Sequence, residues 1–399
     1  MSDSLLPRCG FTGPPGSSAL LFAGLHGHEG LSELFEYRVK VLSPEGELNA
    51  DDWLGKALGL ELHHSAQNSP SSRKVHGHVC GFRRLGDEGR FPCYEFLLRP
   101  WLWFASCASN CRIFQNQSVL EVLKAVLAPY PGEVEWAATE SYAALEYCVQ
   151  FAETDAAFVS RLMEEAGLYY FFRHSGEGHS LVVTDSMSEH RSLEAGDTLY
   201  WRVGSDDNFH SLWDWVPQQA LCSGRVSAAD FDFSKANTRE ASVLAAAASI
   251  AAGHDQAGFE HYRYPGHFNN SASGEAATKV RVQALHALRQ RVGATGCAPY
   301  LLPGGTFKLS GHADPGQNAE YLITRATLTA TCRVSSTGVS APSFSCDIEA
   351  IGSNARYRAP VQTPRPRMPG PQTAFVVGKA GEQLWVDEFG RVKVQFHWD

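Results

Sequence analysis

The 399-residue chain lacks the features that mark several large classes of protein. Charged residues make up only 19% of it, below the ~25% of average globular proteins. Its longest apolar stretch, residues 242–252, is rich in alanine and too short to span a bilayer. The first residues, Met1 to Ser4, lack the basic region of a signal peptide. We therefore expect a cytoplasmic protein that does not use the general secretory route.

Cysteine is present, but no CxxC pair occurs among the ten cysteines. A disulfide framework is typical of shorter chains with denser cysteine. The sequence therefore predicts reduced thiols, mostly buried. The closest pair, Cys107 and Cys111, could contribute to a zinc site, but no second pair of ligands accompanies it. We expect these two thiols to lie in a core.

Acidic residues outnumber basic ones, and the net charge of −9 opposes a general nucleic-acid binder. The charge is uneven, because residues 352–381 contain no acid and five bases. Removing those five charges from −9 leaves −14 on the rest of the chain. Arg391 and Lys393 could contact phosphates in an oligonucleotide-binding barrel, an alternative that the net charge disfavours.

The motifs of the commonest enzyme classes are missing: GxSxG, HExxH, GxxxxGK[ST] and GxGxxG do not occur. Glu164 and Glu165 could form an acid–nucleophile pair. Neighbours on a helix point about 100° apart, however, and are poorly placed to flank one bond. We expect both to lie on a solvated helix face. Glu153 and Asp155 flank a helix start, where acids stabilise the free backbone N–H groups.

Histidines form three close pairs, and the two residues of an HxH pair share one face of a strand, where they can chelate a metal. The pairs are His26 with His28, His63 with His64, and His76 with His78. Further ligands are not evident near any pair, so surface or loop positions are the simpler interpretation. We predict no catalytic, cofactor-binding or metal-binding residue and no cofactor.

Short strands dominate the predicted secondary structure, because apolar and polar residues alternate in many segments. The segments are 35–41, 94–98, 168–172, 181–184, 321–331 and 344–351. Many short strands punctuated by Gly and Pro favour barrels or sandwiches.

Three helices interrupt the strands. The first follows Ser118, which forms a capping box with Glu121, and ends before Pro129. The second begins near Asp155 as N-cap and ends at Gly167, a C-cap glycine. The third is expected over residues 275–291.

Five prolines between residues 360 and 371 predict an extended linker with solvent-exposed arginines. Beyond it we expect strands over 373–378, 383–386 and 391–398, with a turn at 387–390. A hairpin of this size is not stable alone. We interpret it as the opening of a barrel whose other strands lie beyond Asp399, and so expect the chain to be cut from a longer protein.

Two segments carry a resemblance to a known family. The first runs from Tyr147 to Phe171 and resembles the hub signature of the VgrG family, the tip proteins of bacterial type VI secretion systems. Its matching residues are Gln150, Glu153, Asp155, Phe158, Arg161, Leu162, Glu164, Glu165, Gly167 and Tyr169. The second comprises Val377-Gly378 and residues 387–399, with Phe389 where tyrosine is usual. Shorter matches occur at 54–56, 76–79, 100–103, 112–115 and 264–266.

The resemblance implies a mainly β fold with helical insertions, built from phage-tail-hub-like barrel domains followed by the start of an oligosaccharide/oligonucleotide-binding (OB) fold. The expected domains are 1–110, a first hub barrel, and 111–175, an insertion that carries the signature. These two are followed by a second hub barrel, 176–351. Next come a proline-rich linker, 352–372, and the incomplete OB barrel, 373–399.

The resemblance also implies a structural function without catalysis. A homotrimer would stack on the hexameric Hcp tube, carry a PAAR-repeat tip protein, contact baseplate components and deliver effector or adaptor proteins. Six similar modules in a threefold ring would match a sixfold tube. The type VI system would secrete the protein into the medium or a target cell. Two alternatives stay open: a baseplate hub of a contractile phage, prophage or tailocin, and a peptidoglycan-cleaving tail enzyme that uses Glu164 and Glu165.

Overall fold

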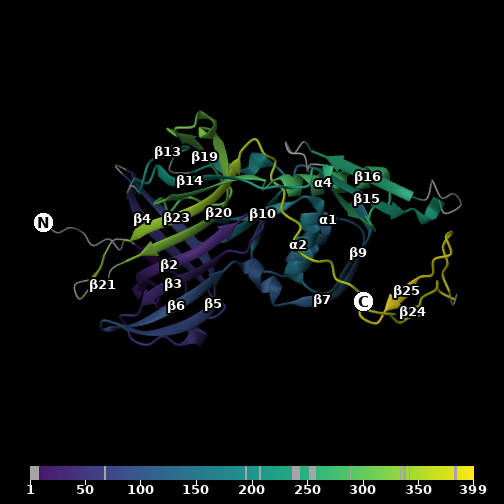
Figure 1. The fold of residues 1–399 in the computed structure, drawn as a ribbon. Helices are drawn as coiled ribbons and strands as arrows, with labels where there is room; N and C mark the ends of the chain where they lie inside the picture. Colours follow the sequence, from purple (N-terminus) through teal and green to yellow (C-terminus); the bar gives the residue numbers. More distant parts are fainter. Residues whose placement is uncertain are drawn as a thin grey trace.

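The computed structural model describes residues 9–66, 69–193, 196–205, 208–235, 243–250, 258–287, 289–332, 334–335, 338–340, 342–381 and 384–399. Thirteen strands form one continuous sheet, whose two halves meet where β2 pairs with β20. Figure 1 shows this sheet on one side of the molecule, with the helices and smaller sheets on the other. The architecture confirms the predicted mainly β class with helical insertions.

The first half of the large sheet is antiparallel throughout. Its strands, in pairing order, are β1 (Cys9–Thr12), β4 (Ala57–Ala66), β5 (Ser69–Glu88), β6 (Phe91–Arg99), β3 (Glu36–Leu42) and β2 (Leu21–Gly30). In β3 the side chains of Tyr37, Val39 and Val41 are fully buried, as the alternation over 35–41 predicts. Alternate side chains of a strand point to the same side of the sheet. The side of β3 that carries Tyr37, Val39 and Val41 therefore faces the core.

The second half of the sheet closes into a barrel, because β19 pairs with β20 as well as with β13. Its strands are β20 (Glu320–Thr331), β23 (Ser343–Gly352), β18 (Gln290–Gly296), β14 (Ser211–Gln219), β13 (Thr198–Trp201), β19 (Gly305–Ser310) and β12 (Arg191–Ser192). Closure pairs the backbone groups that an open edge would leave free.

An insertion of helices and short strands lies beside the two halves (Figure 1). Its elements are β7 (Ser109–Ser118), α1 (Val119–Leu127), β8 (Glu133–Ala137), β9 (Ala144–Thr154), α2 (Asp155–Ala166), β10 (Tyr169–His174) and β11 (His179–Thr184). Strands β7 and β9 pair with each other, and β10, β11 and β8 form a separate sheet. This second sheet runs across residue 175, where the sequence predicts a domain boundary.

Local capping signals set the ends of these helices. The predicted capping box of α1 is present, with Ser118 and Glu121 bonded reciprocally. The predicted N-cap of α2 is wrong by one residue: the side chain of Thr154 accepts from the Ala157 N–H, and Asp155 is the first helical residue. Gly167 ends α2 with φ 76°, a left-handed conformation that favours glycine.

A second group of small elements follows β14. It comprises β15 (Arg225–Phe231), β16 (Val243–Ser249), β17 (Glu260–Arg263) and α4 (Ser271–Ala287). The helix expected over 275–291 therefore starts earlier and ends earlier, and residues 290–296 form β18 instead. Apolar residues continue across the break into β18, so the pattern alone does not mark the helix end. The buried face of β15 and β16 packs on α4 around Phe268.

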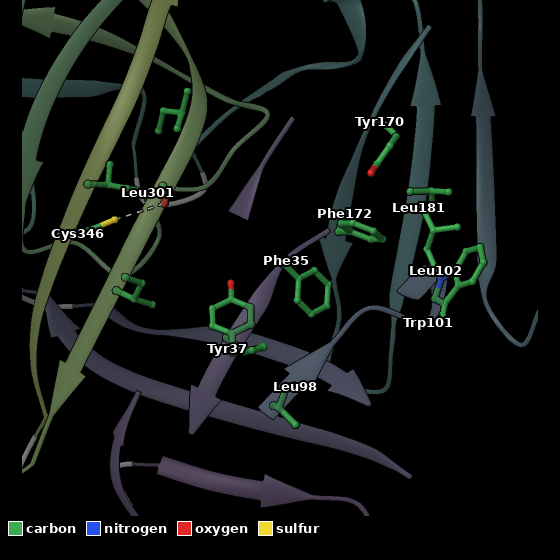
Figure 2. Close-up of a cluster of buried hydrophobic side chains, with 14 of the residues drawn as sticks. Phe35, Tyr37, Leu98, Trp101, Leu102, Tyr170, Phe172, Leu181, Leu301 and Cys346 are labelled. Atoms are coloured by element: carbon green, nitrogen blue, oxygen red, sulfur yellow. Dashed lines mark hydrogen bonds between the residues drawn. The ribbon is translucent and has the colours of Figure 1, made fainter. Parts of the chain in front are cut away.

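The main core joins the first half of the sheet to the insertion. Figure 2 shows Phe35 and Tyr37 beside Phe172, with Trp101 and Leu102 beyond them. The rings of Phe35 and Phe172 meet nearly edge-on, with 5.0 Å between their centroids, an arrangement that aromatic pairs prefer. Trp101 belongs to η3 (Trp101–Ser106) and is 1% exposed. One hydrophobic core therefore extends across both parts.

The C-terminal segment forms a small hairpin of β24 (Ala374–Val376) and β25 (Val394–Phe396). Both are shorter than the predicted strands 373–378 and 391–398. The strand expected over 383–386 is reduced to one bridge between Val386 and Val392, while position 383 lies outside the described residues. Short elements elsewhere are η1 (Ser17–Ala19), η2 (Ala50–Asp52), η4 (Met187–Glu189), η5 (Phe233–Lys235), η7 (Pro315–Gln317), β21 (Val334–Ser335) and β22 (Gly338–Val339). Within the described ranges, no helix is long and apolar enough to cross a membrane.

Candidate functional site

The segment that leaves the second barrel is bound to the insertion rather than free in solvent. Residues 353–365, here called the strap, follow β23 and pass α2 on their way to the C-terminal hairpin (Figure 1). Tyr357, Arg358 and Ala359 are 1–3% exposed. The prediction of exposed linker arginines is therefore wrong for Arg358. The strap fixes the path of the chain from the barrel to the hairpin.

Arg358 ties the strap to both large helices. It donates to the carbonyl of Gly167 at the end of α2, to Oε1 of Gln283 on α4 at 3.2 Å and to Oε1 of Glu140 at 3.0 Å. The C-terminal end of a helix carries partial negative charge and free carbonyls. The buried guanidinium of Arg358 is stable at this position because the groups it donates to are all hydrogen-bond acceptors.

Asp185 holds Glu140 under the strap arginines. Burial alone would raise the pKa of Asp185, but the backbone N–H groups of Thr139 and Glu140 and the hydroxyls of Thr139 and Tyr142 bind its carboxylate and lower the pKa. The ordered Glu140 then forms ion pairs with Arg356 and Arg358.

Glu164 and Glu165 hold the next part of the strap. Oε2 of Glu164 accepts the backbone N–H groups of Gln362 and Thr363, each at 3.0 Å, and Oε1 accepts the Thr363 hydroxyl at 2.7 Å. Both carboxylate oxygens of Glu165 accept from Arg365 at 2.5 Å.

The prediction of a solvated helix face is therefore wrong for Glu164, which is only 8% exposed, while Glu165 is half-buried. Both carboxylates are engaged by the strap instead of facing a substrate groove. The cavity beside Glu164 has a volume of ≈110 Å³, well below the roughly 300 Å³ at which ligand pockets begin.

The other polar residues of the signature segment form one buried network. Asp155 accepts from Arg112 at 2.6 Å, from Gln150 at 2.7 Å and from the Tyr130 hydroxyl at 2.8 Å. Glu153 receives a two-pronged ion pair from Arg161. These contacts join β7, β9 and α2. The acids that the sequence assigns to helix capping therefore also anchor the sheet beneath the helix.

His76 is not a surface residue, contrary to the sequence prediction, and His78 is half-buried. His76 is 8% exposed, and its Nδ1 lies 2.9 Å from Nδ1 of His179. Nε2 of His179 accepts the Trp101 N–H at 3.0 Å, so the proton of this imidazole resides on Nδ1. Burial lowers the pKa of His76 to about 4 and that of His179 to about 2.

This histidine cluster continues into an ion pair within the first half of the sheet, which in turn contacts the second half. His174 accepts the backbone N–H of His76 at 3.1 Å and lies 3.7 Å from Glu29. Glu29 pairs with Arg73, which also donates to the Pro299 carbonyl at 2.9 Å. Burial alone would raise the pKa of Glu29, but Arg73 and His174 lower it. The cluster thus links β2, β5, the β10–β11 hairpin and the second barrel.

The other histidine pairs behave as the sequence predicts or lie outside the described side chains. His26 and His28 are exposed, and His26 bonds the Thr329 hydroxyl at 3.0 Å. His63 is also exposed, while the side chain of His64 is not described. In the described part of the chain, no group of three His, Cys, Asp or Glu side chains has a geometry that could hold a metal ion.

All ten cysteines are free thiols. The core placement expected for Cys107 and Cys111 is wrong, because Cys107 is exposed and Cys111 is half-buried. Four others, Cys93, Cys148, Cys297 and Cys346, are buried.

The basic residues just before β25 bind groups within the chain. Arg391 pairs with Asp387 at 2.5 Å and with Glu146 at 3.1 Å, while Lys393 lies over the Trp385 ring. These contacts connect the hairpin to β9 and to its own turn. The arginine and lysine that the nucleic-acid alternative assigns to phosphates are therefore occupied.

Sequence reasoning missed Arg358 and the partners of Glu164. The one available signal was the run without acids over residues 352–381, which predicts acidic partners elsewhere in the fold. The three acids that meet it, Glu140, Glu164 and Glu165, are roughly 200 residues away along the chain.

Comparison with known proteins agrees with this architecture. The family model described as phage tail baseplate hub (GPD) matches residues 28–333. The type VI secretion system spike protein VgrG1b of Pseudomonas aeruginosa is 38% identical over 393 residues, which cover 97% of this chain and 52% of the relative.

Two solved structures share the fold. The Escherichia coli c3393 protein, a component of the type VI secretion system, superposes with a TM-score of 0.70 at 19% identity, over 97% of this chain and 89% of that one. The tail protein of Neisseria meningitidis MC58 superposes with a TM-score of 0.59 at 13% identity, over 88% of this chain and 99% of that one. The chain spans about half the length of the spike protein that it matches. It therefore belongs to the phage tail baseplate hub family and is a homologue of the VgrG spike proteins of type VI secretion systems.

Proposed function

We propose that the protein is the structural hub of a type VI secretion spike. Three copies form a ring that stacks on the Hcp tube, and the segment after the strap leads into the spike that carries a PAAR-repeat tip protein. The ring contacts baseplate components and carries effector or adaptor proteins. It assembles in the cytoplasm, and the type VI system releases it into the medium or a target cell.

One observation carries this proposal: the strap is anchored to the hub at both helices, by Arg358 and by Glu164. A spike that transmits force needs a fixed direction at the point where it leaves its base. A flexible linker would let the spike swing, whereas buried polar contacts set one path. The sequence similarity to a type VI spike protein supports the same role.

The proposal assigns no catalytic step to this chain. Glu164 and Glu165, the pair that a peptidoglycan-cleaving enzyme would need, bind the strap. Replacing each by alanine tests this point. A lytic activity in the unmodified protein that both variants lose would support the enzyme instead.

The experiment for the main proposal is deletion of the gene in its own bacterium. Loss of Hcp from the culture medium, restored by the intact gene, is the expected result. Hcp release that continues without the gene, when no second spike gene is present, would contradict the proposal.

A baseplate hub of a contractile phage, prophage or tailocin is the second candidate, favoured by the fold shared with a tail protein. The same deletion strain separates the two. After induction of prophages with a DNA-damaging agent, loss of contractile particles in electron micrographs, with Hcp release unchanged, would support the phage-type hub.

A further inference from the structure

Three arginines converge from separate elements at one end of α2. Arg263 ends β17, Arg281 lies on α4, and Arg365 belongs to the strap. We call these three residues the arginine patch. The elements that carry them are packed together, because β17 pairs with β15 and both α2 and β15 contact α4.

Strand register, helix packing and the action of their charges on one another place the three residues close together. Arg263 pairs with Ala228 of β15, which is on the buried, α4-facing side of that small sheet. Arg281 lies on α4, which packs against α2, and its charge acts on Arg263. Two residues before Gly167, Glu165 binds Arg365.

The patch holds an excess of positive charge in a half-buried position. In the described part of the chain, one ion pair involves these three guanidinium groups, that of Arg365 with Glu165. Among the described residues, neither Arg263 nor Arg281 has an acid within ion-pair distance. Burial and the neighbouring Arg365 and Arg281 lower the pKa of Arg263. A desolvated charge without its counter-charge is unfavourable, so an external carboxylate would stabilise this end of the molecule.

The surface next to the patch has the composition of a protein interface. Tyr262 and Tyr264 flank Arg263 along the chain, and their side chains are 61% and 63% exposed. Tyrosine and arginine are enriched where proteins bind one another. The edge of β17 that does not pair with β15 lies beside them.

The chain carries a complementary surface in its other half. The connection between β3 and β4 exposes Glu45, Asp51 and Asp52, none of which forms an ion pair within the described structure. We call these three residues the acidic turn. Leu54, 43% exposed, lies next to it. Figure 1 shows β3 and β4 on one side of the molecule and α4 with β15 and β16 on the other.

We infer that the arginine patch of one protomer binds the acidic turn of a second copy of this chain. A contact between two different surfaces of one chain is heterologous, and repetition about an axis closes it into a ring. The charge outside residues 352–381 is −14, so a second copy offers acids in excess. The inference deepens the proposed trimer by naming the surfaces through which its protomers meet.

Charge reversal tests this contact in the full-length protein. The variant R263E/R281E reverses the patch, D51K/D52K reverses the turn, and the third variant combines all four changes. Sedimentation velocity at several protein and salt concentrations measures assembly. We expect each reversed pair to raise the concentration needed for the trimer at least tenfold, and the combination to restore most of the loss. Added salt should weaken the unmodified trimer.

The variant K74E/K308E is the matched control, because it changes the net charge equally at exposed lysines elsewhere. It should assemble normally. Circular dichroism and thermal unfolding verify that each variant folds. A normal trimer in R263E/R281E would overturn the inference and leave the trimer intact. An unmodified protein that stays monomeric at every concentration would instead contradict the proposed hub as well. Failure of the fourfold variant to recover, after losses in both pairs, would overturn this pairing of surfaces.

Discussion

Replacing Glu164 by alanine should detach the strap from α2. The carboxylate accepts two backbone N–H groups and one hydroxyl from Gln362 and Thr363. Hydrogen bonds to a charged group contribute about 1.5–3 kcal/mol each when buried. Gln362 is exposed, so water replaces part of the loss. We estimate the net cost for the three bonds together at about 2–3 kcal/mol.

Hydrogen exchange measures this cost directly, because it follows the local opening of each amide. A tenfold change corresponds to ~1.4 kcal/mol, so the amides of Gln362 and Thr363 should exchange about 30- to 150-fold faster in Glu164→Ala. Amides in both halves of the large sheet should keep their rates. The effect is local because the strap opens without unfolding the sheet.

The neighbouring variant Glu165→Ala is the control. Its partner Arg365 is 36% exposed, and exposed ion pairs contribute roughly 0–1 kcal/mol. Exchange at residues 362 and 363 should change less than about fivefold in this variant. Unchanged exchange in Glu164→Ala, or equal effects of the two variants, would refute the argument that the buried carboxylate anchors the strap.

Three further perturbations test other parts of the structure. Gly167→Ala should lower the free energy of unfolding by about 1–3 kcal/mol, because φ is +76° and a Cβ would lie 2.9 Å from a valine of α4. Gly178→Ala is the control and should be near neutral, because a Cβ at Gly178 would meet open space. Equal effects of the two substitutions in denaturant titrations would contradict this prediction. Arg358→Ala should lower the free energy of unfolding by about 2–4 kcal/mol, because hydrogen bonds are lost and a cavity is left. An unchanged denaturation midpoint would contradict this prediction. Stability should also fall as pH drops from 6.5 toward 4, because His76 and His179 stay neutral when folded and gain protons when unfolded. At ~1.36 kcal/mol per pKa unit, the lowered pKa of His76 alone accounts for a loss of about 3 kcal/mol in the free energy of unfolding over this pH range. His76→Gln should therefore flatten the dependence of stability on pH, measured by urea titration.

Local patterns in the sequence predict local structure well in this chain. The capping box of Ser118 and Glu121 needs only three residues of separation, and the structure contains it. Alternation over residues 35–41 predicts β3 because the pleat itself sets the period. The end of α4 is harder to predict, because the residues after it are equally compatible with a helix and a strand.

Long-range partners explain what the sequence could not predict. Glu164 looks like a solvated residue because it falls on the polar side of the predicted helix, and its partners are almost 200 residues away. The pairing of His76 with His179 spans 103 residues. Each contact depends on how β10, β11 and the strap pack, which no local periodicity encodes. The same holds for Arg358, whose burial follows from the acceptors that two helices and Glu140 bring together.

The mass of the full-length protein in solution tests the central claim most directly. Light scattering coupled to size exclusion should give three times the mass of one chain, since the proposed hub is a closed ring of three protomers. A full-length protein that is monomeric at every concentration tested would contradict the assignment of a spike hub.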